Sequence, residues 1–223
     1  MARSTSESAP GGAFVFDMDG VLVDSERPAL ALLRALLAEH GVMRDTAELT
    51  HVCGRPEPYM RAFLGDCLGD ESAVATFLER YGAGKLAQLE AGEVHVFEHA
   101  HDVLTALRAA GVPLAVATST QRDLAMRRLH RFGLAERFDA IVTGDQVTNG
   151  KPAPDIFLRA AEALGTPPGA CVAIEDSVVG VEAAERAGMT VVALATTFPA
   201  AALARADHVL PDMRALLAFV TAR

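Results

Sequence analysis

The chain has 223 residues, of which 51% are hydrophobic and 22% charged, and its formal net charge is −9. This length suits one α/β domain with a modest insertion, and the hydrophobic content excludes a disordered chain. The acidic balance argues against nucleic acid or an anionic membrane surface as a partner.

The N-terminal segment and the cysteines favour a cytoplasmic protein. Residues 1–12 are polar, lack the apolar stretch of a signal peptide, and are predicted to form a disordered tail. The three cysteines are widely spaced and show neither a disulfide framework nor a zinc-binding pattern, as expected in a reducing compartment. No run of about 20 apolar residues is present, so no membrane span is expected.

The first part of the chain predicts one strand followed by a helical insertion. Ala13–Phe16 is a short apolar run, typical of a buried strand, that leads into the loop DMDGVLVDSERP. A helix is predicted over Ala29–Glu39, ending at Gly41. Residues 42–92 are helical in character and contain no convincing strand. The predicted domains are a helical cap domain at 28–94 and a core domain at 13–27 and 95–223.

Strands and helices alternate through the rest of the chain. Helices are predicted over 101–110, 121–132, 154–164 and 178–187. Strands are predicted over 113–117, 140–143, 171–174, 190–194 and 208–210. This alternation is typical of right-handed βαβ units. The predicted fold class is therefore α/β, with a Rossmann-like parallel sheet core and an inserted all-helical cap domain.

Polar clusters occur at the ends of several predicted strands. They are Asp17/Asp19, Thr118/Ser119, Gly150/Lys151 and Glu175/Asp176. Ligands of open parallel sheets bind at the carboxyl ends of the strands, so we expect these side chains to converge at one edge.

Asp17 and Asp19 are two residues apart on a turn made possible by Gly20, so both carboxylates can reach one point. Thr118 and Ser119 precede a predicted helix, where hydroxyl and amide groups both cap the helix and bind phosphate. An ordinary turn and an ordinary cap are the alternative interpretations of these two segments.

A lysine and two further acids complete the pattern. Lys151 is one of only two lysines among 20 basic residues, and at this edge it can neutralise a phosphate and a carboxylate. Glu175 and Asp176 would repel each other and the Asp17/Asp19 pair unless a cation is bound. Oxygen ligands without neighbouring His or Cys favour Mg²⁺. With all four acids ionised, Mg²⁺ and Lys151 leave about one negative charge.

The motifs DMDGVLVDSE, ATST, GKPAPDIF and AIEDSVVGVEAAERAG occur in this order. Together they resemble the haloacid dehalogenase superfamily, and most closely its β-phosphoglucomutase-like and phosphoglycolate-phosphatase-like branch, over nearly the whole chain after the tail. The resemblance implies a Mg²⁺-dependent phosphoric monoester hydrolase that acts on a small phosphorylated metabolite, such as a sugar or polyol phosphate. We expect a monomer, because one chain contains every proposed catalytic group.

The resemblance also implies roles for individual residues. Asp17 would be the nucleophile that forms an aspartyl-phosphate, and Asp19 the general acid and base. Thr118 and the Ser119 amide would hold the phosphoryl oxygens, and Lys151 would pair with the phosphate and Asp17. The metal ligands would be Asp17, the Asp19 main-chain carbonyl, Asp176, and Glu175 directly or through water. The implied substrate contacts are Ser119, Gly20 and Arg55, the last as the substrate-loop arginine of the cap.

Two alternatives to a phosphatase stay open. The β-phosphoglucomutases usually carry a histidine where Ala29 stands and a lysine where Gln121 stands, so both departures favour a phosphatase over a mutase. A non-catalytic phosphometabolite-binding protein would not need both Asp17 and Asp19. Asp19 also disfavours dehalogenation, because the dehalogenases typically lack an acid at this position.

Overall fold

A six-stranded parallel sheet forms the centre of the molecule, with the strand order β5-β4-β1-β6-β7-β8. Its strands are β1 (Ala13–Phe16), β4 (Leu114–Ala117), β5 (Ala140–Val142), β6 (Cys171–Glu175), β7 (Thr190–Leu194) and β8 (His208–Leu210). Because β1 pairs with β4 on one side and with β6 on the other, the strand order reverses around β1. Ligands bind at such a reversal, beyond the carboxyl ends of the strands.

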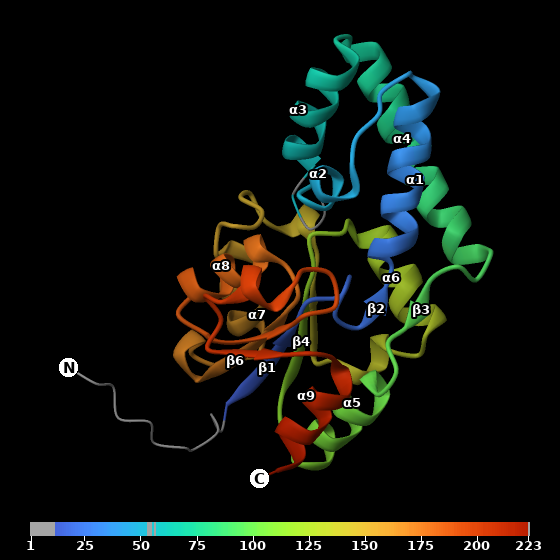
Figure 1. Cartoon of the computed structure of the whole chain (residues 1–223). Helices are drawn as coiled ribbons and strands as arrows, with labels where there is room; N and C mark the ends of the chain where they lie inside the picture. The colour runs from blue at the N-terminus through green and yellow to red at the C-terminus, as the bar shows by residue number, and fades with distance from the viewer. Residues whose placement is uncertain (1–11, 53–54, 56, 223) are drawn as a thin grey trace.

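The computed structural model describes residues 12–52, 55 and 57–222 (Figure 1). Residues 1–11 of the predicted tail lie outside the described residues. Among the described residues, no helix is both long and apolar enough to cross a membrane.

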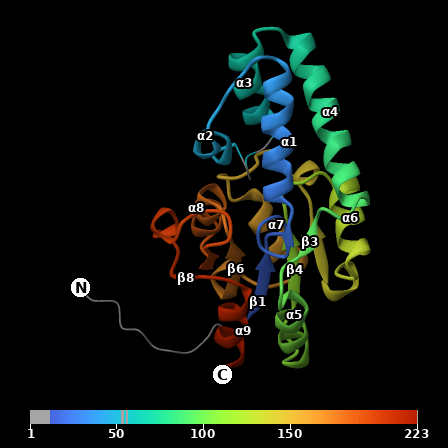
Figure 2. The same cartoon turned by 45° about the vertical axis from the view of Figure 1, so that its right-hand side comes forward.

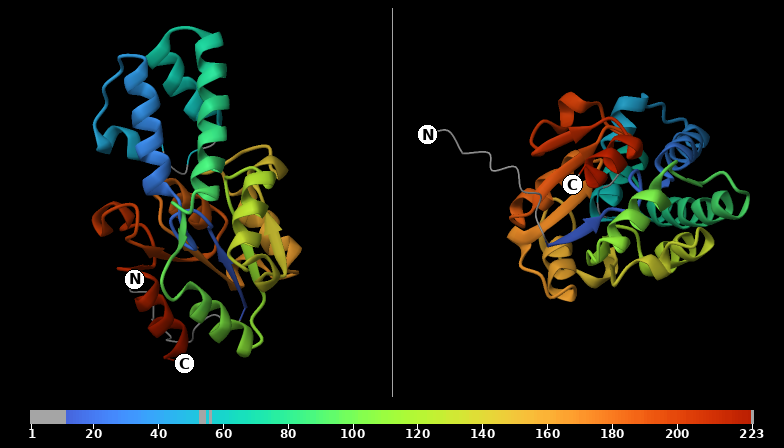
Figure 3. Two further views of the ribbon diagram at one scale, coloured as in Figure 1. Left: turned by 90° about the vertical axis from the view of Figure 1, so that its right-hand side faces the viewer. Right: turned by 90° about the horizontal axis from the view of Figure 1, so that it is seen from below.

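Helices cover both faces of the sheet, because side chains alternate across each strand. Phe14 and Phe16 face one helical layer, and Ala13 and Val15 face the other. The first layer contains α5 (Ala100–Ala109), α6 (Arg122–Arg131) and α9 (Met213–Thr221), and the second contains α7 (Asp155–Ala163) and α8 (Val178–Arg186). The lower helices α5 and α9 pack against each other (Figure 3).

A second group of helices stands beyond the carboxyl edge of the sheet. It contains α1 (Glu26–Glu39), α2 (Thr46–Thr50), α3 (Glu57–Leu68) and α4 (Glu71–Glu90). These helices share an apolar core of their own, which includes Leu33, Leu64 and Phe77. The long helices α1 and α4 lie side by side (Figure 2). The predicted α/β class with an inserted helical region is therefore confirmed, while the predicted domain boundaries stay a prediction.

Among the α-helices and strands of the described residues, three were not predicted from the sequence. The short strands β2 (Val23–Asp24) and β3 (His95–Val96) form an antiparallel pair where the chain leaves and re-enters the core. Two-residue strands show no periodic pattern, so only the tertiary pairing reveals them. The third element, α9, does carry a local signal, because the carboxylate of Asp212 accepts the N–H of Ala215 and caps an apolar run.

Candidate active site

A cavity of about 690 Å³ lies between the carboxyl edge of the sheet and the inserted helices. Seven of the residues predicted for the site line it: Asp17, Asp19, Arg55, Thr118, Ser119, Lys151 and Asp176. The volume is within the range of small-molecule binding sites. The expected convergence of strand ends therefore occurs, from β1, β4 and β6 and from the loop before α7.

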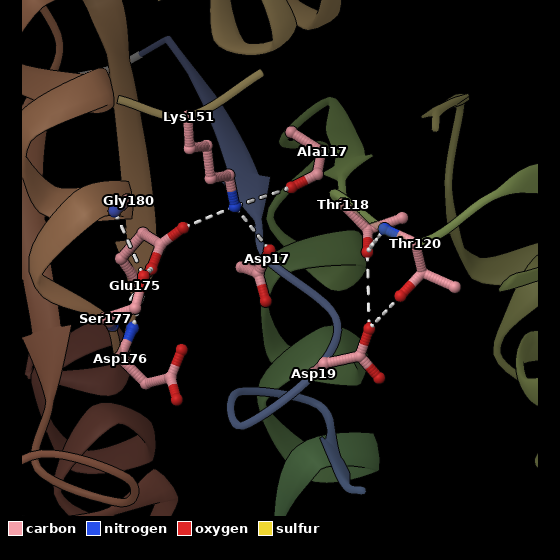
Figure 4. Close-up of polar contacts among 10 residues, drawn as sticks. All are labelled: Asp17, Asp19, Ala117, Thr118, Thr120, Lys151, Glu175, Asp176, Ser177 and Gly180. Atoms are coloured by element: carbon pink, nitrogen blue, oxygen red, sulfur yellow. Dashed lines mark hydrogen bonds and ion pairs between the residues drawn. The ribbon is translucent and has the colours of Figure 1, made fainter. Parts of the chain in front are cut away.

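Lys151 joins two of the carboxylates (Figure 4). Its Nζ lies 2.5 Å from Asp17 Oδ1 and 2.5 Å from Glu175 Oε1, and it also donates to the carbonyl oxygen of Ala117 at 3.3 Å. Burial acts to lower the pKa of Lys151, but Asp17 and Glu175 outweigh it and raise that pKa above its ordinary value. Lys151 is therefore a permanently charged, buried cation at neutral pH.

Glu175 lies behind Lys151 and is fully buried. Its Oε1 accepts from Lys151, and its Oε2 accepts from the main-chain N–H groups of Asp176 and Ser177 and from the Ser177 hydroxyl at 3.0–3.1 Å. A Cβ on Gly180 would lie 2.0 Å from this carboxylate, so the first turn of α8 approaches it closely. Both oxygens of Glu175 are thus engaged by donors.

Asp17 and Asp176 are buried carboxylates that line the cavity. Burial raises the pKa of Asp17 well above its ordinary value, and the charges of Glu175 and Asp19 raise it further against the attraction of Lys151. Burial likewise raises the pKa of Asp176, with Glu175 and Asp17 as the next causes. Such mutual repulsion makes this a place where a bound cation is stabilising.

Gly20 shapes the loop that carries Asp17 and Asp19. Its φ is 84°, and its N–H donates to the carbonyl oxygen of Val23 at 2.8 Å. A Cβ at this position would lie 1.9 Å from Asp176 Oδ2. Only glycine lets the loop turn in this way while it approaches Asp176 so closely.

Asp19 is held by several donors on the core side of the cavity. Its Oδ1 accepts from the Ser25 hydroxyl at 2.5 Å and from Arg128 Nη1. Its Oδ2 accepts from the hydroxyls of Thr120 at 2.6 Å and Thr118 at 3.4 Å (Figure 4). Burial acts to raise the pKa of Asp19, but Arg128 and the hydroxyls of Ser25 and Thr120 outweigh it, so that pKa is lowered.

Sequence reasoning missed three of these partners, namely Ser25, Thr120 and Arg128. Ser25 and Thr120 belong to segments that the motifs did include, DMDGVLVDSE and ATST. Arg128 carries a weaker signal, since it falls beside Ala125 and Leu129 on the buried face of α6. A charged residue at such a helix position is rarely buried without a partner.

The side of the cavity formed by the inserted helices is also polar. The Arg55 guanidinium carbon lies 4.2 Å from the centre of the Tyr59 ring, and its Nε donates to the carbonyl oxygen of His51 at 3.0 Å. Glu57 accepts from Gln121 Nε2 at 3.2 Å, which is a direct contact between the inserted helices and the core. The structure thus brings Arg55 to the same cavity as Asp17.

Three comparisons with known proteins bear on this site. The sequence profile of the haloacid dehalogenase-like hydrolases matches residues 14–194. Validoxylamine A 7'-phosphate phosphatase of Streptomyces hygroscopicus subsp. limoneus is 34% identical over 199 residues, covering 89% of this chain and 92% of that protein. The phosphorylated carbohydrates phosphatase of Thermotoga maritima is 34% identical over 177 residues, covering 79% and 82%. A crystal structure of a HAD family hydrolase from Deinococcus radiodurans R1, with bound phosphate and sodium, has a TM-score of 0.73 and 34% identity and covers 96% and 97%.

Proposed function

The chain belongs to the haloacid dehalogenase-like hydrolase family, and we propose that it hydrolyses a phosphorylated sugar or polyol through an aspartyl-phosphate intermediate. Within the family it falls in the branch of the β-phosphoglucomutases and phosphoglycolate phosphatases, and it is a phosphatase, that is, a phosphoric monoester hydrolase. The contact of Lys151 with Asp17 at the edge of the cavity is the observation that carries the proposal.

Asp17 is the nucleophile in this proposal. One carboxylate oxygen of Asp17 attacks phosphorus while the bond to the leaving oxygen breaks, and Asp19, which carries a proton at this point of the cycle, gives it to that oxygen. Asp19, now ionised, then takes a proton from the water that attacks the aspartyl-phosphate. Cleavage of the bond from phosphorus to Asp17 restores its carboxylate and releases phosphate. Lys151 stabilises the negative charge on the phosphoryl oxygens during both transfers.

Thr118 and Ser119 hold the phosphoryl group in the proposal, through a hydroxyl and a main-chain N–H at the end of β4. The Thr118 side chain is buried and lies at the same edge as Asp17 and Lys151. A set of donors that is positioned before the reaction is worth more in a buried site than in water. All these groups come from one chain, so the proposal needs no second copy.

The acidic groups of the site fit a divalent cation. Four carboxylates and the two buried cations Lys151 and Arg128 leave two uncompensated negative charges when all are ionised. In the described part of the chain, no three His, Cys, Asp or Glu side chains form a complete metal cluster. Mg²⁺ is typically held by one or two carboxylates and several waters, and Asp17, Asp176 and the Asp19 carbonyl match that set. Bound there, Mg²⁺ would offset charge on the transferring phosphoryl group.

The resemblance left open whether Glu175 contacts the metal directly or through water. Its two oxygens already accept from Lys151 and from the start of α8. This engagement favours a role in orienting Lys151 over direct contact with the metal.

The other charged residues of the cavity lining favour a leaving group without a second charge. Apart from the residues assigned to the phosphoryl site, the described lining residues include four basic side chains, Arg55, Arg61, Lys85 and Arg127, and four acidic ones, Glu26, Glu57, Glu79 and Asp123. These charges balance, so a second phosphate or a carboxylate gains little net attraction there. A neutral sugar or polyol, which needs donors and acceptors, suits this lining better, and hydrolysis is favoured over a mutase reaction with a bisphosphate intermediate.

The test uses phosphorus NMR to measure phosphate release from a panel of sugar and polyol monophosphates. We expect free phosphate from the wild-type protein and background release from Asp17→Asn, which keeps the side-chain size but removes the nucleophile. Asp66→Asn, an exposed position on α3, is the matched control and should behave as wild type. A panel with no phosphate release would overturn the proposal and favour a binding protein. Conversion of β-glucose 1-phosphate into glucose 6-phosphate would establish a mutase instead.

A further inference from the structure

Arg128 is a buried arginine whose charge is directed at Asp19. Its side chain is 4% exposed, and Nη1 pairs with Asp19 Oδ1, whose side chain is 11% exposed. Among the described residues, Arg128 and Lys151 are the buried basic side chains. A buried charge is strongly unfavourable unless it is paired. Lys151 has a proposed role in the phosphoryl site, whereas no motif explains Arg128.

Arg128 contacts Asp19 from outside the cavity lining. Asp19 lines the cavity, while Arg128 is not among the described residues that line it. The Nε of Arg128 is buried and has no acceptor within the described chain, and the guanidinium contacts Asp19 Oδ1 through Nη1. The residue therefore reaches the cavity only through the Asp19 carboxylate.

The two oxygens of Asp19 have chemically different partners. Oδ1 accepts from Arg128, which has donors only, and from Ser25. Oδ2 accepts from the hydroxyls of Thr118 and Thr120, and a hydroxyl can either donate or accept. A proton on Oδ1 would face an N–H of Arg128, whereas a proton on Oδ2 can be accommodated. Arg128 thus distinguishes the two oxygens.

We propose that Arg128 is a positioning residue for Asp19, which anchors Oδ1 from behind the cavity so that Oδ2 exchanges the proton with the substrate. The inference rests on the proposed function. In the first step, the O–H bond at Oδ2 breaks and its proton joins the leaving oxygen as that oxygen separates from phosphorus. Arg128 itself neither touches the substrate nor gains or loses a proton.

The test compares two leaving groups in Arg128→Met. A sugar phosphate, such as glucose 6-phosphate or fructose 1-phosphate, needs a proton on its departing alkoxide, whereas p-nitrophenolate leaves without one. Since general acid catalysis is worth roughly 100- to 10,000-fold, we expect kcat/KM to fall about 100-fold or more for the sugar phosphate. We expect a fall of less than about tenfold for p-nitrophenyl phosphate, because kcat/KM ends at phosphoenzyme formation. Equal losses on both substrates would overturn the inference.

Two further variants separate positioning from folding. Arg128→Lys keeps the charge without the planar fork and should recover part of the sugar phosphate activity. Arg131→Met, at an exposed position of the same helix, should retain wild-type kinetics. If Arg128→Met does not fold, as thermal unfolding would reveal, Arg128→Lys and Arg128→Gln carry the same comparison.

The decisive measurement is a double-mutant cycle with Asp19→Asn. If Arg128 acts through Asp19, its replacement should have little further effect on kcat/KM once Asp19 is asparagine. A full additional loss in that background would overturn the inference. The proposed function fails separately, since its failure appears as a wild-type protein that releases phosphate from neither substrate.

Discussion

Replacing Lys151 with methionine removes a cation that two buried carboxylates share. Its Nζ lies 2.5 Å from Asp17 Oδ1 and from Glu175 Oε1, and the three side chains are 2%, 9% and 0% exposed. Each contact corresponds to about 7 kcal/mol of Coulomb attraction at an effective dielectric of 20, and desolvation offsets several kcal/mol of this per ion. Removing one partner of a buried pair costs about 3–5 kcal/mol. We expect Lys151→Met to lower the free energy of unfolding by about this amount at neutral pH.

The sign of the pH dependence follows from the pKa of Asp17. Lys151 acts to lower that pKa, so its removal moves the value still further above that of the unfolded chain. A carboxyl group whose folded pKa is raised stabilises the fold below its unfolded pKa of about 3.9 and loses that contribution as the pH rises through the folded pKa. The deficit of Lys151→Met should therefore be smaller near pH 4 than at neutral pH.

Urea unfolding of the metal-free protein, followed by circular dichroism at about pH 4 and about pH 7, measures this difference. Lys85→Met removes the other lysine, which lies on α4, and should cost much less. Adding Glu175→Gln to Lys151→Met should recover part of the stability, because Glu175 is a buried charge that lost its partner in the single variant. Phosphate release should be absent from both variants. A Lys151→Met protein as stable as wild type at neutral pH, or equally destabilised at both pH values, would refute the reasoning.

Two further predictions concern the metal and the Gly20 turn. EDTA should abolish phosphate release, and added Mg²⁺ should restore it. In thermal unfolding, Mg²⁺ at about 100 times its Kd should stabilise the fold by about 2.7 kcal/mol. Phosphate release in the presence of EDTA, or a melting temperature that Mg²⁺ does not change, would contradict the proposed carboxylate metal site. Gly20→Ala places a Cβ 1.9 Å from Asp176 Oδ2 and should weaken Mg²⁺ binding, measured by titration calorimetry. The matched control is Gly41→Ala. Gly41 has a φ of 72° and nothing within 4 Å of a Cβ, so this variant should show only the backbone cost of about 1–2 kcal/mol. Equal Mg²⁺ affinities in the two variants would contradict the prediction.

The convergence of the motifs could be predicted because it depends on sheet topology alone. Apolar runs directly precede Asp17, Thr118 and Glu175, and parallel strands bring their carboxyl ends to one edge. The partners of Asp19 could not be predicted in the same way. Whether Arg128 is buried depends on how α6 rotates against the sheet, which a single charged residue in an amphipathic helix does not reveal.

Glu175 illustrates a second limit. Its neighbour Asp176 lines the cavity, but alternation along β6 and the turn into α8 direct the two carboxylates apart. In the sequence the two residues are simply adjacent acids. Only the contacts of Glu175 with Lys151 and Ser177 show that the two carboxylates lie in different environments.

An acidic protein can bind an anion because the charge close to the binding site matters more to the anion than the net charge of the whole chain. The sequence-based count of four acids against Mg²⁺ and Lys151 leaves about one negative charge, which would oppose a phosphate. The structure adds Arg128, whose pair with ionised Asp19 offsets that charge, so the proposed site would be formally neutral with Mg²⁺ bound. The four carboxylates, Lys151 and Arg128 contribute −2 to the formal net charge of −9, so the remaining −7 lies elsewhere on the chain. In the proposed mechanism Arg128 therefore acts in two ways: it orients Asp19, and while Asp19 is ionised it offsets one of the four carboxylate charges beside an anionic substrate.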